Sequence, residues 1–348
     1  MVCETLEAKV VELSNKINPL EDEVKLLRED NDKLRNKEAE HLELSMQPNT
    51  KNKIIEHKLP LNIKKYGHRN AESNVTVVTM FHKFSKSKHS LSEYELWVSN
   101  FFSSVRCPIA IFIDRESFNF VNNLSHIHKL NITFFITNSV WDIIEMLEEK
   151  RDKKYIQNYK TIQNSLDPEK SIHNPSLYAA WNAKHFMCKF ASDLNLFKSD
   201  FFIYTDIGAW RNSIYPNWPD VNFVNKVKLD LQDRILYGQI NKKEMIDDNP
   251  RIDSIEGTFF AGSKKAIDQA HDAFYKIHDE WFDMNMFVGK DQTIMNVITF
   301  KRYSHLVKRL MSWSAVCKKY YDVWFFYQAF FASQDQFQCE NDKLSLIK

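Results

Sequence analysis

Residues 199–211 read Ser-Asp-Phe-Phe-Ile-Tyr-Thr-Asp-Ile-Gly-Ala-Trp-Arg, and this stretch decides the fold. Its apolar run predicts a buried strand, because it is short, rich in aromatic residues and followed by a turn with glycine. Asp206 then stands at the carboxyl end of this strand. In open α/β sheets, ligands bind beyond the carboxyl ends of the strands. We therefore expect Asp206 to face a binding site.

Strand and helix candidates alternate on both sides of this stretch. Near-continuous apolar strands that alternate with amphipathic helices predict an α/β fold, with a mainly parallel sheet flanked by helices. The helix from 174 to about 194 has a clear start, because Asn174 is a good N-cap and Pro175 suits the first turn. The expected strands are 75–82, 109–114, 132–137, 201–206 and 235–240, and the other expected helices are 91–103, 116–129 and 140–163.

The N-terminal segment has a different pattern, a heptad repeat. Leucine recurs at one core position, and β-branched residues with a single asparagine occupy the other. This combination favours a parallel two-stranded coiled coil, so we expect a homodimer through residues 6–41. The alternative is an amphipathic helix that packs on its own domain. The repeat consists of Leu6, Leu13, Leu20, Leu27 and Leu34, interleaved with Val10, Ile17, Val24 and Asn31.

The chain therefore divides into four parts. We expect a coiled-coil dimerisation segment at 1–45, a polar linker at 46–72, an α/β domain at 73–333 and a polar tail at 334–348. The first part carries a net charge of −5 and the remainder +6. This mild excess suits an anionic ligand and does not indicate nucleic-acid binding.

Several classes of protein are excluded by what the sequence lacks. It has no apolar run long enough to span a bilayer and no P-loop, G-x-G-x-x-G or G-x-S-x-G motif. The five cysteines are scattered and form no C-x-x-C pair, so we expect unpaired thiols in a reducing compartment. With no secretory signal at its start, the chain is expected to be cytoplasmic. Its histidines have no metal-ligand spacing, and we expect His82 to be a packed or surface side chain.

Asp206 and Arg211 are the first candidate site residues. A carboxylate can hold Mg²⁺ or Mn²⁺ together with phosphate oxygens, and a guanidinium can bind a diphosphate with two parallel hydrogen bonds. The alternative is a salt bridge between Asp206 and Arg211 that closes the turn.

The sequence resembles the HtrL/YibB-like group of glycosyltransferase-like proteins over roughly residues 74–303. The blocks that carry the resemblance are Asn174-Pro175-x-Leu177-Tyr178-x-x-Trp181-Asn182-x-Lys184, Ser199 to Arg211 as quoted above, Glu256-Gly257-Thr258-Phe259-Phe260-Ala261-Gly262, and Asp291-Gln292. The resemblance implies a GT-A-like fold, a nucleotide-sugar donor and a divalent cation (Mn or Mg) at Asp206, with Lys184 facing the donor. The sequence departs from the usual pattern of such enzymes because it lacks an Asp-x-Asp motif, so Arg211 or Lys184 would supply the charge for the leaving group.

The remaining candidates follow from the chemistry of sugar transfer, which needs a base near the acceptor hydroxyl. Asp291 is the candidate base, and its alternative role is to cap the helical run 293–300. Asp114 is a candidate contact to the nucleotide ribose, or else a turn residue that ends its strand. Gly208 belongs to the donor side, and the expected acceptor-side wall comprises Gly257, Thr258, Gly262 and Gln292.

The predicted function is a nucleotide-sugar-dependent glycosyltransferase that acts on a hydroxyl acceptor. The alternative is a non-catalytic coiled-coil scaffold, or a sugar- or nucleotide-binding protein that retains only the fold.

Overall fold

The computed structural model describes residues 62–66, 73–84, 89–126, 130–147, 153–242, 249–313, 321–339 and 342–348. The predicted coiled coil at 1–45 and the dimer contact at 6–41 lie outside these ranges, as does most of the linker predicted at 46–72. The coiled coil and the dimer stay predictions. The predicted linker is wrong over residues 62–66, because these residues form a strand of the sheet that pairs with residues 132–136.

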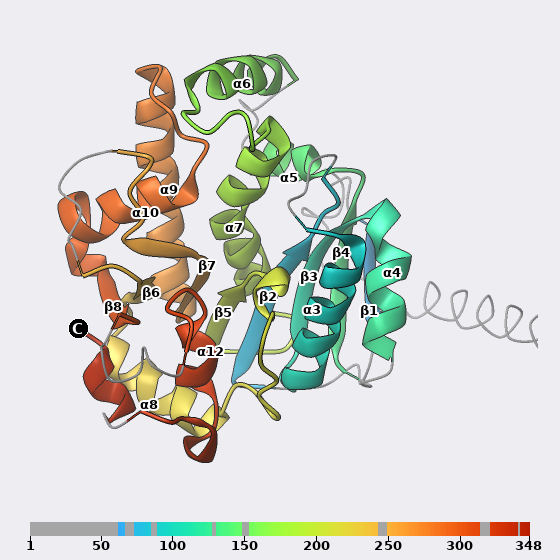
Figure 1. Cartoon of the computed structure of the whole chain (residues 1–348), viewed down its shortest axis with the longest axis vertical. Coiled ribbons are helices and arrows are strands. Elements are labelled where there is room, and N and C mark those ends of the chain that lie inside the picture. Colours follow the sequence, from blue (N-terminus) through green and yellow to red (C-terminus); the bar gives the residue numbers. More distant parts are fainter. Residues whose placement is uncertain are drawn as a thin grey trace, which may run out of the picture. The chain divides into compact units, whose positions relative to one another are not determined.

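The described residues form an eight-stranded mixed sheet with the order β1-β4-β3-β2-β5-β7-β6-β8 (Figure 1). Strands β4, β3, β2 and β5 run parallel to one another, and β6 runs parallel to β8. Strand β1 is antiparallel to β4, and β7 is antiparallel to both β5 and β6. The predicted α/β class with a mainly parallel sheet is confirmed. The strands are β1 (Asn62–Tyr66), β2 (Val75–Phe81), β3 (Ile109–Asp114), β4 (Ile132–Thr137), β5 (Phe201–Thr205), β6 (Ile235–Gln239), β7 (Ile255–Gly262) and β8 (Val307–Met311).

Helices cover both faces of the sheet, so the fold has three layers (Figure 1). The central strands are buried on both sides, and this explains why they read as continuous apolar runs. One face packs against α3 (Leu91–Ser104), α4 (Arg115–His126), α8 (Val221–Leu231) and α12 (Phe326–Phe331). The other packs against α5 (Val140–Leu147), α7 (Pro175–Leu194), α9 (Lys264–Asp283) and α10 (Asp291–Val297), while α6 (Lys153–Leu166) packs on α7.

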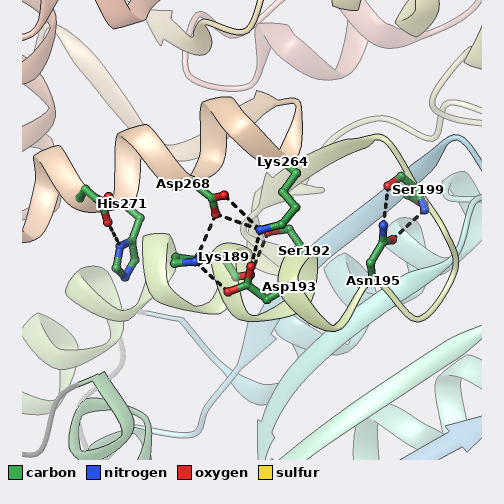
Figure 2. A network of polar contacts seen from close by, with 9 residues as sticks. Lys189, Ser192, Asp193, Asn195, Ser199, Lys264, Asp268 and His271 are labelled. Carbon is green, nitrogen blue, oxygen red and sulfur yellow. Dashed lines mark hydrogen bonds and ion pairs between the residues drawn. The ribbon is translucent and has the colours of Figure 1, made fainter. Parts of the chain in front are cut away.

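Helix α7 begins as the sequence predicts, with the side chain of Asn174 accepting a hydrogen bond from the backbone N–H of Leu177. Its C-terminal half is tied to α9 by a network of ion pairs at the surface (Figure 2). Lys189 Nζ lies 2.7 Å from Asp193 Oδ2 and 3.2 Å from Asp268 Oδ1, and Lys264 contacts the same two aspartates. Because these groups are partly exposed, each pair contributes only about 0 to 1 kcal/mol. The network aligns α7 against α9.

The C-terminal segment, expected to be a polar tail at 334–348, packs against the domain where it is described. Leu346 and Ile347 are buried, and Ile347 pairs with Leu310 of β8. The backbone N–H of Arg309 donates to the carbonyl of Lys348, with 2.8 Å between the atoms. The tail therefore covers the outer edge of β8, and its polar composition hid the few apolar side chains that anchor it.

The cysteines also differ from expectation. Cys107 and Cys188 are free and buried, but Cys339 is disulfide-bonded. The expectation of unpaired thiols throughout is therefore wrong for Cys339. In the part of the chain that the structure describes, no helix combines the length and the apolar character that crossing a bilayer requires. The cytoplasmic location stays a prediction.

Candidate functional site

A cavity of about 250 Å³ lies where the parallel neighbours β2 and β5 end. The chain leaves β2 through His82 and leaves β5 through Asp206, and both residues line the cavity. This position at the carboxyl edge of parallel strands is the usual place for a ligand in an α/β sheet. The wall also carries the charged Arg211 and the hydroxyl groups of Thr258 and Tyr94.

Asp206 is held in place by its neighbours and yet stays partly open, with 28% of its side chain exposed. Tyr204 donates its hydroxyl hydrogen bond to Asp206 Oδ1 over 2.8 Å, and Lys184 Nζ lies 3.2 Å from Oδ2. The backbone N–H of Asp206 donates to the carbonyl of Thr258 on β7. A carboxylate fixed at both oxygens and along its backbone presents one orientation to the cavity.

Lys184 is buried beneath Asp206 and does not line the cavity. Its Nζ lies 3.2 Å from Asp206 Oδ2, 3.1 Å from Asp291 Oδ2 and 2.8 Å from the carbonyl oxygen of Gly257. Burial alone lowers the pKa of Lys184, but the charges of Asp206 and Asp291 outweigh burial and hold it above its usual value. The expectation that Lys184 faces the donor is therefore wrong, because two carboxylates and a carbonyl draw its ammonium group inward.

Asp291 is likewise enclosed, with 3% of its side chain exposed. Its Oδ1 accepts the backbone N–H of Gln292 over 2.9 Å, and its Oδ2 faces Lys184. Burial raises the pKa of Asp291, and the charge of Lys184 opposes this rise. A general base must reach the acceptor proton. Asp291 does not line the cavity, so its position beneath the cavity suits holding Lys184 in place and not the predicted role of base. The alternative of a helix cap is wrong, because Lys290 is the N-cap of α10 and Asp291 follows it.

A third carboxyl group, Glu256, lies fully buried next to these residues. Its Oε2 accepts the hydroxyl hydrogen bond of Thr258 over 2.7 Å, and its Oε1 has no hydrogen-bond partner. Burial raises the pKa of Glu256 well above its usual range. Its side chain fits only because residue 238 is glycine, since a Cβ there would lie 1.8 Å from Oε1. Glu256 was not among the candidate site residues predicted from the sequence.

Arg211 reaches the cavity from the turn after β5. Its guanidinium carbon lies 4.6 Å from the ring centre of Trp97 and 5.3 Å from that of Phe325, and its Nε donates to the carbonyl of Gly208. Stacking between aromatic rings fixes a guanidinium while leaving its charge available. The structure gives no ion pair between Arg211 and Asp206 within 4.0 Å, so the alternative of a closing salt bridge is wrong.

Aromatic side chains make up half of the rest of the wall, and they were not among the residues predicted from the sequence. Tyr94 and Trp97 lie one turn apart on α3, whose start is fixed by a capping box between Ser90 and Glu93. Trp181 lies on α7, one turn before Lys184 in the same sequence block. Spacing of three and four residues on these helices was the available signal. The aromatic residues that line the cavity are Phe81, Phe84, Tyr94, Trp97, Trp181 and Phe325.

His82 is packed, as expected, but it also lines the cavity. Its Nδ1 lies 3.7 Å from Asp114 Oδ2, and burial lowers the pKa of His82 to about 4. The ring is therefore neutral near pH 7. Asp114 itself does not line the cavity. Asp114 accepts hydrogen bonds from the backbone N–H groups of Lys83 and Ser117. It is therefore the turn residue that ends its strand, which was the alternative to a contact with the ribose.

The expected acceptor-side wall is only partly present. Residues 255–262 form strand β7, not a loop, and Gly262 pairs with Phe202 at the opposite end of β5 from Asp206. Gly262 is therefore too far from the cavity to line it. Gln292 donates its side-chain amide to the carbonyl of Ile255, and Gly257 lies against Asp291, so neither lines the cavity. Thr258 and Gly208 do line it.

The donor set does not fit a resident divalent cation. Both oxygens of Asp206 are already engaged by Tyr204 and Lys184, and Asp206 is the one acid on the described cavity wall. Among the residues that the structure describes, no group of three or more His, Cys, Asp or Glu side chains is placed to hold a metal ion. Mg²⁺ demands a near-octahedral set of oxygen ligands, and the described wall of this cavity offers too few of them.

No protein-family model and no curated protein matches the sequence, so the resemblance to the HtrL/YibB-like group stays a prediction. Two of the solved structures that share a distant likeness with this chain are described by name. One is mouse xyloside xylosyltransferase 1 in its apo form, at 13% identity and a TM-score of 0.43, with 78% of this chain and 96% of that chain covered. The other is 4-diphosphocytidyl-2C-methyl-D-erythritol synthase from Anaerococcus prevotii, at 11% identity and a TM-score of 0.29, with 68% and 88% covered. At such scores the substrates of those proteins say nothing about this one.

Proposed function

We propose that this chain transfers a sugar from a nucleotide-sugar donor to a hydroxyl acceptor. One observation carries the proposal. Asp206 and Arg211 share the wall of an aromatic-lined cavity at the carboxyl edge of the parallel strands β2 and β5. Aromatic faces suit sugar and base rings, a guanidinium suits a diphosphate and a carboxylate suits hydroxyl groups.

The chemistry of transfer assigns a task to each charged group. The bond between the sugar C1 and the diphosphate oxygen breaks, and its electron pair leaves on the diphosphate, where Arg211 balances the developing charge. The acceptor oxygen forms the new bond to C1 and gives its proton to the carboxylate of Asp206. Lys184, fixed below Asp206, keeps that carboxylate oriented toward the cavity. The earlier assignment of the proton transfer to Asp291 gives way to Asp206, because Asp206 is the carboxylate that lines the cavity.

Ligand-dependent melting tests the binding half of this proposal. The protein is melted alone and with UDP-, GDP- and CMP-sugars, and a donor at a hundred times its Kd should stabilise the fold by about 2.7 kcal/mol. Arg211→Ala should lose most of this shift, Arg211→Lys should keep part of it and Asp206→Asn should retain it. Arg302→Ala is the matched control, because Arg302 pairs with Glu280 at the surface and lies outside the cavity wall.

The outcomes distinguish a glycosyltransferase from a non-catalytic scaffold. A shift by one donor class that depends on Arg211 supports the enzyme. The absence of any shift with all three classes would favour the non-catalytic scaffold.

A further inference from the structure

The position of the Lys184 ammonium group is unusual because three oxygens surround it at close range. Two belong to the carboxylates of Asp206 and Asp291 and the third to the carbonyl of Gly257, at distances of 3.2, 3.1 and 2.8 Å. Two carboxylates and a carbonyl are hard oxygen ligands of the kind that divalent cations take. Here the cation that they share is part of the protein.

Residue 257 is glycine for a reason that concerns this arrangement. A Cβ at this position would lie 2.9 Å from Asp291 Oδ2 and 3.0 Å from Oδ1. A larger residue would therefore push the carboxylate of Asp291 away from Lys184. The backbone N–H of Gln292 then holds Oδ1 of Asp291 in place. Sequence and packing together maintain the close approach of the two charges.

We propose that the ammonium group of Lys184 is the permanent cation of this site, and that ligand binding in the cavity above it requires no divalent metal. The inference rests on the proposed function for the nature of the ligand, but its first test uses no nucleotide. A direct consequence follows for a chain without this lysine. Asp206, Asp291 and the carbonyl of Gly257 would then face a vacated, negatively charged space that suits a small divalent ion.

The first test measures the binding of Mn²⁺ in the absence of nucleotide. Electron paramagnetic resonance detects the Mn²⁺ that remains free. The wild-type chain should show no Mn²⁺ site that depends on Asp206. Lys184→Ala should gain one, because ligand charge and number set the affinity of hard cations and the two carboxylates are then free to bind the ion. The double variant Lys184→Ala/Asp206→Asn should lose the gain. Lys189→Ala, which removes a surface lysine from the same helix, should gain nothing.

Two results would overturn the inference. One is a wild-type Mn²⁺ site that Asp206→Asn removes. The other is a Lys184→Ala protein that circular dichroism shows to be folded but that acquires no site. If Lys184→Ala does not fold, the comparison of wild type with Asp206→Asn decides the question by itself.

A second arm separates this inference from the proposed function. The melting shift with UDP, GDP or CMP is measured in EDTA and again in Mn²⁺. Equal shifts support the inference, and a shift seen only with Mn²⁺ contradicts it. If none of the nucleotides or their sugars produces a shift, the proposed function fails, while the Mn²⁺ titration still decides the role of Lys184.

Discussion

Lys184 and Asp291 form an ion pair in the interior, with 3.1 Å between Nζ and Oδ2 and 3% of either side chain exposed. An ion pair this deep carries a large desolvation cost, which its Coulomb attraction and hydrogen bonds must offset. Asp206 shares the same ammonium group and extends from it to the cavity. The pair therefore connects the interior of the domain to the one acid on the described cavity wall.

Breaking this pair should destabilise the fold strongly. Lys184→Met leaves the charge of Asp291 buried without its partner, and we expect a loss of about 3 to 5 kcal/mol in the free energy of unfolding. Urea denaturation measures this loss. The double variant Lys184→Met/Asp291→Asn should recover part of it, because the fully buried carboxylate is then neutral and only the partly exposed Asp206 has lost its partner. A single-variant loss below about 1 kcal/mol, the value for a surface pair, would contradict the burial of the pair.

Glu256 should make the stability depend on pH. Burial raises its pKa in the folded protein, so above its usual value of 4.5 the unfolded chain has lost a proton that the folded chain still holds. Stability then falls as pH rises, by about 1.4 kcal/mol per unit for one such group. Glu256→Gln cannot titrate and should flatten the dependence by that amount. Urea denaturation at roughly pH 5 to 7 compares the two slopes, and identical slopes would mean that Glu256 ionises normally.

Gly257→Ala should disturb the pair between Lys184 and Asp291 through crowding alone. The added methyl group would lie within 3.0 Å of both carboxylate oxygens of Asp291, and overpacking of this kind costs about 1 to 3 kcal/mol. Gly208→Ala is the matched control, because its methyl group meets nothing closer than Tyr94 at 3.4 Å. Thermal unfolding compares the two variants. Equal melting temperatures would argue against a tight approach of Asp291 to residue 257.

The heptad repeat predicts a dimer, although residues 6–41 lie outside the described ranges. Leu20→Asp/Leu27→Asp places charges at two core positions and should convert the dimer to a monomer, because buried charges without partners are not tolerated in a coiled-coil seam. Light scattering coupled to size exclusion measures the mass. Glu29→Ala, at an outer position of the predicted heptad, should leave the dimer intact. A wild-type protein with the mass of a monomer would contradict the predicted coiled-coil dimer.

The buried parallel strands could be predicted from the sequence. The edge strands β1 and β8 and the antiparallel strand β7 could not. The bounds of β3 and β4 match their predictions because both are continuous apolar runs. Strand β7 was not predicted, since its buried Glu256 and two glycines break the apolar pattern. Strand β8 carries Lys308 and Arg309, and β1 carries Lys64 and Lys65, so neither shows an apolar run.

The site, like the fold, was predicted only in part. Asp206 follows from its place after a buried strand, but the inward direction of Lys184 depends on Asp291, which lies more than a hundred residues away in the sequence. The aromatic wall likewise joins α3, α7 and the segment before α12, which meet only in the folded chain. Local pattern identifies such residues individually and does not bring them together.

The most direct measurement is the release of UDP, GDP or CMP from the corresponding nucleotide-sugars, with a mixture of hydroxyl acceptors present. The wild-type protein should release one of these nucleotides, and Asp206→Asn should reduce the rate by about 10²- to 10⁴-fold, the contribution of a positioned base, while the donor still shifts the melting temperature. Equal release by the wild type and Asp206→Asn, or no release from any donor by a protein that also binds none, would contradict the account.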